Sequence, residues 1–184
     1  MFDKERYVIT GGPGLGKSSL LSALEQLGFA VCAESARIII DGWRRAGSPF
    51  PSPWTDRATF DSEIEKLMLS AYFRDVSGPI VFDRGLPDLI AWRSYLGQPR
   101  DSRLEALITA HPYSSPIFLT PKWAPWYRSD DDRPFSRNKS FALNDSIEST
   151  YRSLGYDVVE LPKVDVDGRA AFFASYMTSR NHFR

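Results

Sequence analysis

The amino-acid sequence predicts a three-layer α/β fold, in which helices cover both faces of a five-stranded parallel sheet. Short, continuously apolar runs alternate along the chain with longer segments whose apolar residues recur at helical spacing. Strands that are apolar throughout are typical of a sheet buried on both faces, and the alternation of strand and helix is typical of parallel order. The length of 184 residues is that of one ordinary domain, so we expect a single domain over residues 1–184.

Five apolar runs are the expected strands, at residues 6–10, 29–33, 79–83, 115–119 and 156–161. The segments with helical spacing are the expected helices, at residues 17–27, 35–46, 56–76, 87–96, 104–110, 141–154 and 168–178. Residues 48–55 contain three prolines and are expected to form a loop. Residues 121–136, rich in Pro, Trp, Arg and Asp, show no clear period, and we expect a mobile excursion there.

Composition excludes several classes of function. The 23 Lys and Arg residues balance the 23 Asp and Glu residues, which argues against binding to extended nucleic acid. No apolar run approaches the ~18 residues of a membrane span, and the charged N-terminus lacks the core of a signal peptide. The single cysteine, Cys32, lies in an apolar stretch, which fits a buried thiol and a cytoplasmic location. With His111 and His182 as the other candidates, a zinc site has almost no ligands.

A glycine-rich motif follows the first expected strand and precedes the first expected helix. Residues 11–18 match the phosphate-binding pattern GxxxxGK[S/T], in which backbone N–H groups surround phosphate oxygens. Lys17 supplies a catalytic cation, and Ser18 supplies a ligand for Mg²⁺. The sequence therefore predicts a site for a nucleoside triphosphate with Mg²⁺; a glycine-rich turn with an accidental lysine is the alternative. The predicted nucleotide-binding residues are Gly11, Gly12, Pro13, Gly14, Leu15, Gly16, Lys17, Ser18 and Ser19.

Charged residues follow two other expected strands, at the edge where ligands bind in open α/β sheets. Asp83 is placed either to hold the water shell of Mg²⁺ or to accept a proton from an attacking hydroxyl, and Arg84 to bind a substrate anion. The alternative is that Asp83 only caps the next helix. Glu34 and Arg37 are expected on one helix face pointing into the same crevice, as catalytic and substrate-binding groups. A solvated glutamate at a helix start is the alternative there.

The excursion at about residues 121–137 is expected to act as a lid that carries Arg128, Arg133 and Arg137. Arginines on such a lid would neutralise the charge that develops during phosphoryl transfer. Arg133, near the middle of the lid, is the best catalytic candidate, and Arg128 is a candidate for nucleotide binding. An ordinary exposed loop is the alternative. Residues 161–166, after the last strand, are a weaker candidate for the border of the nucleotide base.

Four segments carry a resemblance to a known family: residues 11–18, Ala-Glu-Ser-Ala-Arg at 33–37, Phe-Asp-Arg-Gly-Leu-Pro-Asp at 82–88, and residues 154–162. The chain resembles a family of small bacterial predicted ATPases of the AAA type, related to the nicotinamide-riboside kinase domain of the NAD-regulatory protein. Thymidylate and deoxynucleoside kinases are more distant relatives. The resemblance implies a P-loop fold with sheet order 2-3-1-4-5, ATP and Mg²⁺ as the donor complex, and Glu34, Asp83 and Arg84 as base or substrate contacts.

Two functions follow from these patterns. The first is a small-molecule kinase that phosphorylates a hydroxyl of a nucleoside-like or other metabolite. The second is a nucleotide-binding switch with slow hydrolysis and a protein or lipid partner. Neither glutamine, Gln26 nor Gln98, adjoins Asp83 as a water-positioning residue, and residues 138–141 break the guanine-reading pattern, so a kinase using ATP is favoured. A ring-forming motor is disfavoured because Arg84 follows Asp83 where a glutamate is needed. Since Arg outnumbers Lys 17 to 6, we also expect a locally basic cleft enclosing two carboxylates.

Overall fold

Five parallel strands form the centre of the molecule. The computed structural model describes residues 5–45, 56–128 and 135–181. The strands lie in the order β2-β3-β1-β4-β5, which is the predicted order, and every neighbouring pair is parallel. Their bounds are β1 Arg6–Thr10, β2 Ala30–Cys32, β3 Ile80–Asp83, β4 Ile117–Leu119 and β5 Val158–Glu160. The carboxyl ends of all five strands therefore meet at one edge of the sheet.

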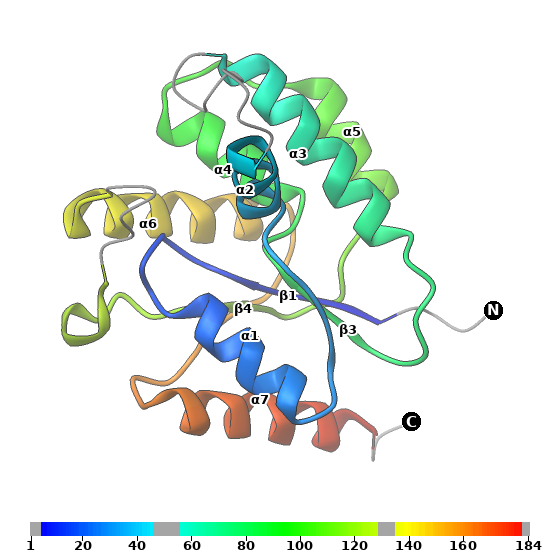
Figure 1. Cartoon of the computed structure of the whole chain (residues 1–184), viewed down its shortest axis with the longest axis vertical. Helices are drawn as coiled ribbons and strands as arrows, with labels where there is room; N and C mark the ends of the chain where they lie inside the picture. Colours follow the sequence, from blue (N-terminus) through cyan, green and yellow to red (C-terminus); the bar gives the residue numbers. More distant parts are fainter. Residues whose placement is uncertain (1–4, 46–55, 129–134, 182–184) are drawn as a thin grey trace.

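Helices cover both faces of this sheet, as the sequence predicts (Figure 1). On one face α1 packs against α7; on the other lie α2 to α6. The helices are α1 Lys17–Gln26, α2 Ser35–Arg45, α3 Arg57–Tyr72, α4 Pro87–Tyr95, α5 Ser102–Ala110, α6 Arg137–Ser153 and α7 Val166–Asn181. A short 3₁₀ turn, η1 (Ala124–Trp126), follows β4. No helix in the described ranges is long and apolar enough to cross a membrane.

The central strands send alternate side chains into two separate apolar cores. In β1, Tyr7 and Ile9 pack with α1 and α7, whereas Val8 packs with the helices of the other face. In β3, Val81 faces α1 and α7, and its neighbour Phe82 faces the opposite side. Because successive side chains of a strand point to opposite faces, a strand buried on both sides must be apolar at every position. This is why the strands are recognisable as continuous apolar runs.

The element bounds differ from the prediction mainly at the ends. α3 ends at Tyr72, four residues before the predicted end, and α6 begins at Arg137, four residues before the predicted start. The start of α6 is set by Ser136, whose hydroxyl accepts a hydrogen bond from the backbone N–H of Lys139. The apolar period alone does not reveal such a polar cap. The whole predicted loop at 48–55 lies outside the described residues, as do residues 129–134 of the predicted lid, including Arg133.

Candidate active site

The glycine-rich motif forms the connection between β1 and α1. Gly14 and Gly16 have φ values of 74° and 83°, in the left-handed region that glycine adopts without strain. The side chain of Lys17 folds back into this loop, and its Nζ donates hydrogen bonds to the carbonyl oxygens of Gly11 and Gly12, both at 2.9 Å. Ser18 lies exposed in the first turn of α1. The lysine and serine therefore lie at the positive end of a helix, where anions bind.

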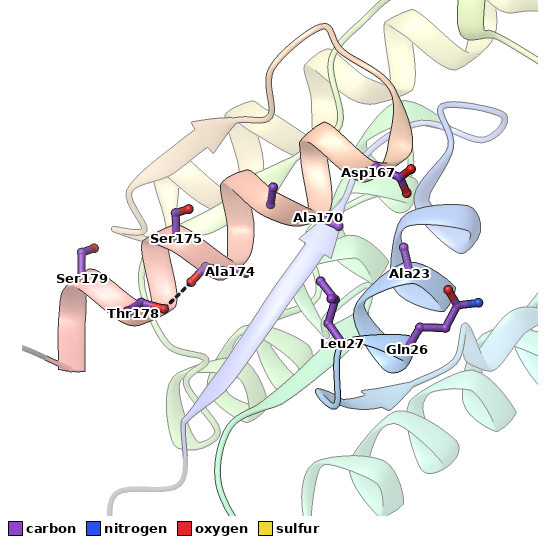
Figure 2. Close-up of a pocket in the computed structure, with 10 residues that line it drawn as sticks. Ala23, Gln26, Leu27, Asp167, Ala170, Ala174, Ser175, Thr178 and Ser179 are labelled. Carbon is purple, nitrogen blue, oxygen red and sulfur yellow. Dashed lines mark hydrogen bonds between the residues drawn. The ribbon is translucent and has the colours of Figure 1, made fainter.

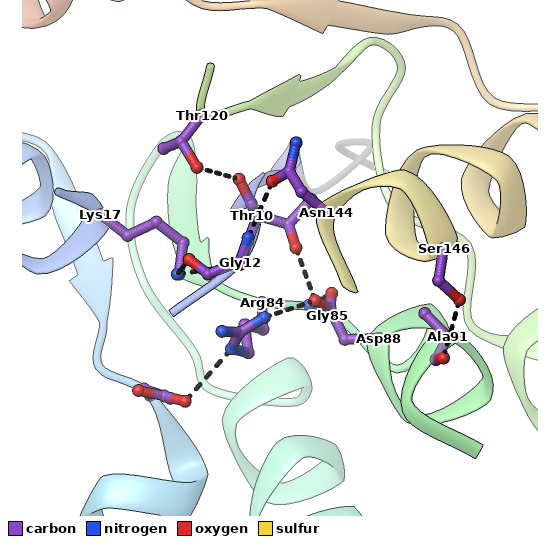
Figure 3. Close-up of polar contacts among 12 residues, drawn as sticks. Thr10, Gly12, Lys17, Arg84, Gly85, Asp88, Ala91, Thr120, Asn144 and Ser146 are labelled. Carbon is purple, nitrogen blue, oxygen red and sulfur yellow. Dashed lines mark hydrogen bonds and ion pairs between the residues drawn. The ribbon is translucent and has the colours of Figure 1, made fainter. Parts of the chain in front are cut away.

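Helix α6 holds the outer part of this loop in place. The side-chain oxygen of Asn144 accepts a hydrogen bond of 2.8 Å from the backbone N–H of Gly12 (Figure 3). The hydroxyl of Ser140 donates one of 2.6 Å to the carbonyl of Pro13. A Cβ atom at Gly12 would collide with the backbone of Ser140, so the close approach requires glycine. Sequence reasoning did not single out Ser140 or Asn144, since neither belongs to a local motif.

Asp83 ends β3 at the same edge of the sheet. Its side chain is 5% exposed, and its Oδ1 has no hydrogen-bond partner among the described residues. Helix α4 begins with Leu86 as its N-cap and has no side-chain cap, so the alternative in which Asp83 caps that helix is wrong. A buried carboxylate oxygen without a partner is costly, which suggests a role with a ligand. Asp83 is therefore the strongest candidate for the reacting edge of the site.

Arg84 and Glu34 form a buried ion pair beside Asp83. The Nε of Arg84 lies 3.1 Å from Oε1 of Glu34, and both side chains are less than 10% exposed. Glu34 precedes α2 but is not the solvated glutamate of the alternative interpretation. Arg84 adopts a φ of 73°, a left-handed backbone conformation that is rare for residues other than glycine. This strained turn directs the Arg84 side chain back toward β2 and the start of α2.

Asp88 connects this ion pair to the rest of the fold. Its Oδ1 lies 3.0 Å from Nη1 of Arg84 and accepts a hydrogen bond of 2.5 Å from the hydroxyl of Thr10, as Figure 3 shows. Its Oδ2 accepts hydrogen bonds from the backbone N–H of Gly85 and the hydroxyl of Tyr151. Asp88 is 1% exposed, so these four donors compensate for its burial. The sequence hint was its spacing of four residues from Arg84 in the Asp-Arg-Gly-Leu-Pro-Asp segment.

The charges at this edge shift one another's pKa values. The pKa of Asp83 is raised to about 6, first by burial and then by the charge of Glu34, against the opposing charges of Lys17 and Arg84. The pKa of Lys17 is lowered to about 8, first by burial and then by Arg84, although the three nearby carboxylates oppose this shift. A carboxylate with a pKa close to neutral is suited to accept a proton during catalysis. Perturbed pKa values of this kind cluster at functional sites.

The residues present fit a magnesium ion bound together with a triphosphate. Mg²⁺ usually takes one or two protein ligands and completes its shell with phosphate oxygens and water. Asp83 offers a buried oxygen without a partner, and Ser18 offers an accessible hydroxyl next to the lysine. Within the described ranges no three His, Cys, Asp or Glu residues are grouped to hold a metal by themselves. The donor set therefore suits an ion that arrives with a nucleotide.

A pocket opens beside this charged cluster, with a free volume of about 50 Å³. Pro13 of the glycine-rich loop borders it, and the Glu34, Arg84 and Asp88 cluster forms its polar end. Arg57 of α3 lies at the pocket as well, with its guanidinium 5.5 Å from the ring centre of Trp92. The apolar lining comes from α2, α3, α4 and the segment just before α6: Ala36, Phe60, Ile64, Met68, Leu89, Trp92 and Phe135. The pocket thus joins the phosphate-binding loop to an apolar chamber.

Three arginines predicted for the site, Arg37, Arg128 and Arg137, do not line this pocket. Arg37 is exposed on α2 and does not line the pocket, because the buried side of α2 is formed by Ser35 and its apolar neighbours; Arg57, which the sequence did not suggest, lines it instead. Arg128 is exposed and donates to the carbonyls of Pro125 and Tyr127. Arg137 is exposed in the first turn of α6.

The expectation of a basic cleft with two carboxylates is wrong for the described residues. The buried cluster contains two cations, Lys17 and Arg84, and three carboxylates, Glu34, Asp83 and Asp88. The arginine count did not reveal this balance because most of the arginines counted toward the cleft are solvent-exposed. With Arg57 at the pocket, three cations and three carboxylates lie around this edge of the sheet.

A second hollow lies on the opposite face of the sheet, between α1 and α7 (Figure 2). It is an open groove of about 810 Å³, lined mainly by small side chains, among them Ala23, Ala174 and Ser175. Asp167 is the one charged residue in its lining, and none of the residues of the glycine-rich motif takes part. The groove is larger than the pocket beside Asp83 but offers no converging charged groups.

A family model and several solved structures resemble this chain. A family model described as an AAA domain matches residues 6–169. Curated protein sequences give no match. Similar solved structures include a shikimate kinase from Acinetobacter baumannii in complex with shikimate, at 14% identity and a TM-score of 0.60, with 97% of this chain and 95% of that chain covered.

Two further solved structures have the same fold. A deoxyadenosine kinase from M. mycoides is 14% identical, with a TM-score of 0.59 and coverage of 95% of this chain and 98% of that chain. A thymidylate kinase from Ehrlichia chaffeensis is 12% identical, with a TM-score of 0.61 and coverage of 94% and 99%. At these identities the likeness establishes the fold, a parallel sheet of order 2-3-1-4-5 with a phosphate-binding loop after the first strand.

Proposed function

The chain belongs to the AAA domain family, and we propose that it is a small-molecule kinase, which transfers the γ-phosphoryl group of ATP to a hydroxyl of a nucleoside-like or other small metabolite. One observation carries the proposal. The pocket lined by Pro13 of the phosphate-binding loop is also lined by the buried cluster of Glu34, Arg84 and Asp88. A phosphoryl donor in the loop and an acceptor in the pocket would therefore meet at the carboxyl edge of the sheet.

The donor side rests on the glycine-rich loop. Backbone N–H groups of residues 11–18 would surround the phosphates, and the ammonium of Lys17 would leave the carbonyls of Gly11 and Gly12 to contact phosphate oxygens. Ser18 would bind Mg²⁺ directly, and Asp83 would face its water shell, which leaves the carboxylate able to accept a proton. A bound Mg²⁺ offsets the negative charge of the phosphates during transfer.

The acceptor side rests on the pocket. Its free volume of about 50 Å³ holds only a few water molecules, so the pocket must widen to admit a metabolite. Apolar walls, with Phe60 and Trp92 among them, suit an acceptor with a planar or apolar part. Glu34 and Arg84 at the polar end would bind and orient its hydroxyl groups.

The chemical step needs a proton acceptor at that polar end. In the proposed step the acceptor oxygen forms a bond to the γ-phosphorus while the bond from that phosphorus to the bridging oxygen breaks, so that ADP leaves. The hydroxyl proton passes to the Oδ1 of Asp83, which is buried, lacks a partner and has a pKa of about 6. Kinase names among the similar structures support the proposal in general terms, although none of them identifies the acceptor.

A nucleotide switch with slow hydrolysis is the alternative function. Such proteins commonly position water with a glutamine close to the nucleotide. Here Gln26 lines the groove between α1 and α7, and Gln98 lines a polar pocket beside α4 and α5, so neither lies at the phosphate-binding loop. This placement favours phosphoryl transfer to an acceptor over hydrolysis.

The test is an ADP-release assay with Mg-ATP and a panel of nucleosides, polyols and hydroxy acids, with product phosphorylation confirmed by mass spectrometry. We expect one acceptor class to raise ADP release at least ~10-fold above the rate without acceptor. The matched control is Lys17→Met, which keeps a side chain of similar length and should bind ATP roughly 100-fold more weakly. Folded protein that binds ATP but is not stimulated by any acceptor would instead support the switch.

A further inference from the structure

The phosphate-binding loop has two sides that contact different parts of the protein. Pro13 lines the proposed acceptor pocket, and Gly12 and Pro13 are held by α6. On the other side, the carbonyl of Gly14 accepts a hydrogen bond of 3.0 Å from the backbone N–H of Arg128, and the carbonyl of Leu15 accepts one of 3.3 Å from Nη1 of Arg169. The loop therefore separates an acceptor side from a side formed by η1 and α7.

This division fixes the direction of a bound nucleotide. The γ-phosphate must point toward the acceptor pocket and Asp83 if its phosphoryl group is to be transferred. The other end of a triphosphate, with its sugar and base, must then leave the loop on the side of Gly14 and Leu15. In Figure 1, η1 follows β4 on this side of the sheet, between α6 and the beginning of α7.

Two tryptophans lie side by side on η1. The rings of Trp123 and Trp126 are stacked, with centroids 5.5 Å apart and planes inclined by 12°, and both side chains are half-buried. The backbone N–H of Trp126 donates a hydrogen bond of 3.1 Å to the carbonyl of Trp123, which fixes the turn that carries them. Stacked aromatic rings that remain partly accessible offer a flat apolar face on which a further ring can stack.

Arg169 joins these rings to the phosphate-binding loop. Its guanidinium carbon lies 5.2 Å from the ring centre of Trp126 and 5.9 Å from that of Trp123, while its nitrogens donate to the carbonyls of Pro162 and Leu15. The side chain is 1% exposed. Lys17, Arg84 and Arg169 are the buried cations in the described parts of the chain. The carboxylates beside Asp83 act on the pKa values of Lys17 and Arg84, whereas burial alone lowers the pKa of Arg169. A buried cation next to an anion-binding loop indicates that the missing negative charge comes from the ligand.

We propose that Trp123 and Trp126, held by Arg169, form a preformed platform on which the base of the bound nucleoside triphosphate stacks. The assignment rests on the proposed function, because the direction of the nucleotide follows from the position of the acceptor pocket. The platform recognises the face of the base, which every nucleobase offers. Because Arg169 fixes both rings before the ligand arrives, little side-chain entropy is lost on binding.

The experiment compares the binding of ATP with that of inorganic tripolyphosphate, both with Mg²⁺, by isothermal titration calorimetry. Tripolyphosphate occupies the phosphate-binding loop but has no base. We expect Trp126→Leu and Trp123→Leu to raise the Kd of ATP by about tenfold each and to change the Kd of tripolyphosphate less than about twofold. Trp126→Phe, which keeps an aromatic face, should restore most of the ATP affinity. Trp43→Phe, in a tryptophan of α2 that packs against Phe60, is the matched control and should change neither Kd.

A second readout covers the case in which the leucine variants do not fold. In the unaltered protein, ATP should quench tryptophan fluorescence, whereas tripolyphosphate should not, and the quench should persist in Trp43→Phe. The proposal is overturned if ATP and tripolyphosphate quench equally, or if a folded Trp126→Leu variant binds both ligands with the original ratio of Kd values. These binding measurements are independent of any acceptor: absence of a phosphorylated product would contradict the kinase proposal and leave the platform result standing.

Discussion

The groove between α1 and α7 and the pocket beside Asp83 differ in volume, which is the property by which binding sites are usually found. The groove has a volume of about 810 Å³ against about 50 Å³ for the pocket. Yet small side chains line the groove, whereas the pocket gathers three buried charged residues, Glu34, Arg84 and Asp88, next to the phosphate-binding loop. Hollow space on a helix pair results from short side chains, but buried charges are retained only where they are compensated or used.

The pocket region itself contains two kinds of buried carboxylate. Both carboxylate oxygens of Asp88 accept hydrogen bonds. These bonds hold Arg84, Thr10 and the start of α4 together. Asp83 has a buried oxygen without a partner and a raised pKa. The first contributes to the stability of the site, and the second lowers stability while remaining available for a ligand. Substitutions at the two positions should therefore change stability in opposite directions.

The largest expected effect is on turnover in Asp83→Asn. The amide cannot accept the proton, so we expect kcat with the identified acceptor to fall at least ~100-fold, while the Kd of ATP changes far less. Steady-state kinetics and calorimetry measure the two quantities. A retained kcat would exclude Asp83 from the chemistry. Replacing Mg²⁺ with Mn²⁺ tests whether any loss reflects metal binding, since a metal ligand would shift the metal dependence of the rate.

The same variant should be more stable than the original protein without ligand. The carboxyl of Asp83 has a pKa of about 6 in the folded state, above its value of ~3.9 in an unfolded chain, so the folded state binds the proton more tightly. The Asp83 carboxyl, taken by itself, therefore lowers the stability of the original protein by about 3 kcal/mol as the pH rises from 4 to 6. The asparagine of the variant does not titrate, so it adds no such dependence of stability on pH. The free energies of unfolding of the two proteins should nearly coincide at pH 4 and differ most above pH 7, as denaturant titrations at each pH will show.

A change of stability in the opposite direction is expected for Asp88→Ala. The substitution leaves Arg84 and the hydroxyl of Tyr151 buried with fewer partners, which costs about 3–5 kcal/mol of the free energy of unfolding. Urea titration measures the loss. Glu148→Ala is the matched control: it breaks an exposed ion pair with Arg152 on α6 and should cost less than ~0.5 kcal/mol. Equal losses in the two variants would show that burial does not distinguish them.

The smallest effect is expected in the groove. Ala171→Leu adds a branched side chain to an exposed position in its lining, and it should change neither the Kd of ATP nor kcat. The free energy of unfolding should stay within ~0.5 kcal/mol of the original value. The same calorimetric and kinetic measurements apply. A loss of nucleotide binding or activity in this variant would show that the groove, and not only the pocket beside Asp83, takes part in function.

The sequence by itself determined the elements and the phosphate-binding loop. The continuous apolar runs predicted the strands because strands buried on both faces need apolar residues at every position. The motif at residues 11–18 predicted the loop because its glycines and Lys17 act over a few neighbouring residues. The position of Asp83 at the carboxyl edge followed from the end of its strand. All of these are local properties, which depend on residues close together in the chain.

Tertiary structure alone decided which charges meet. Asn144 and Gly12 are 132 residues apart, Arg169 and Leu15 are 154 apart, and Tyr151 and Asp88 are 63 apart. Pairs at such separations depend on how helices pack across the sheet, so neither periodicity nor motif could predict them. The packing of helices also decides which arginine lies at the pocket. Arg37 had the expected spacing from Glu34, but the packing of α3 beside α2 and α4 places Arg57 at the pocket instead. Local sequence specifies elements, and packing specifies which side chains form the site.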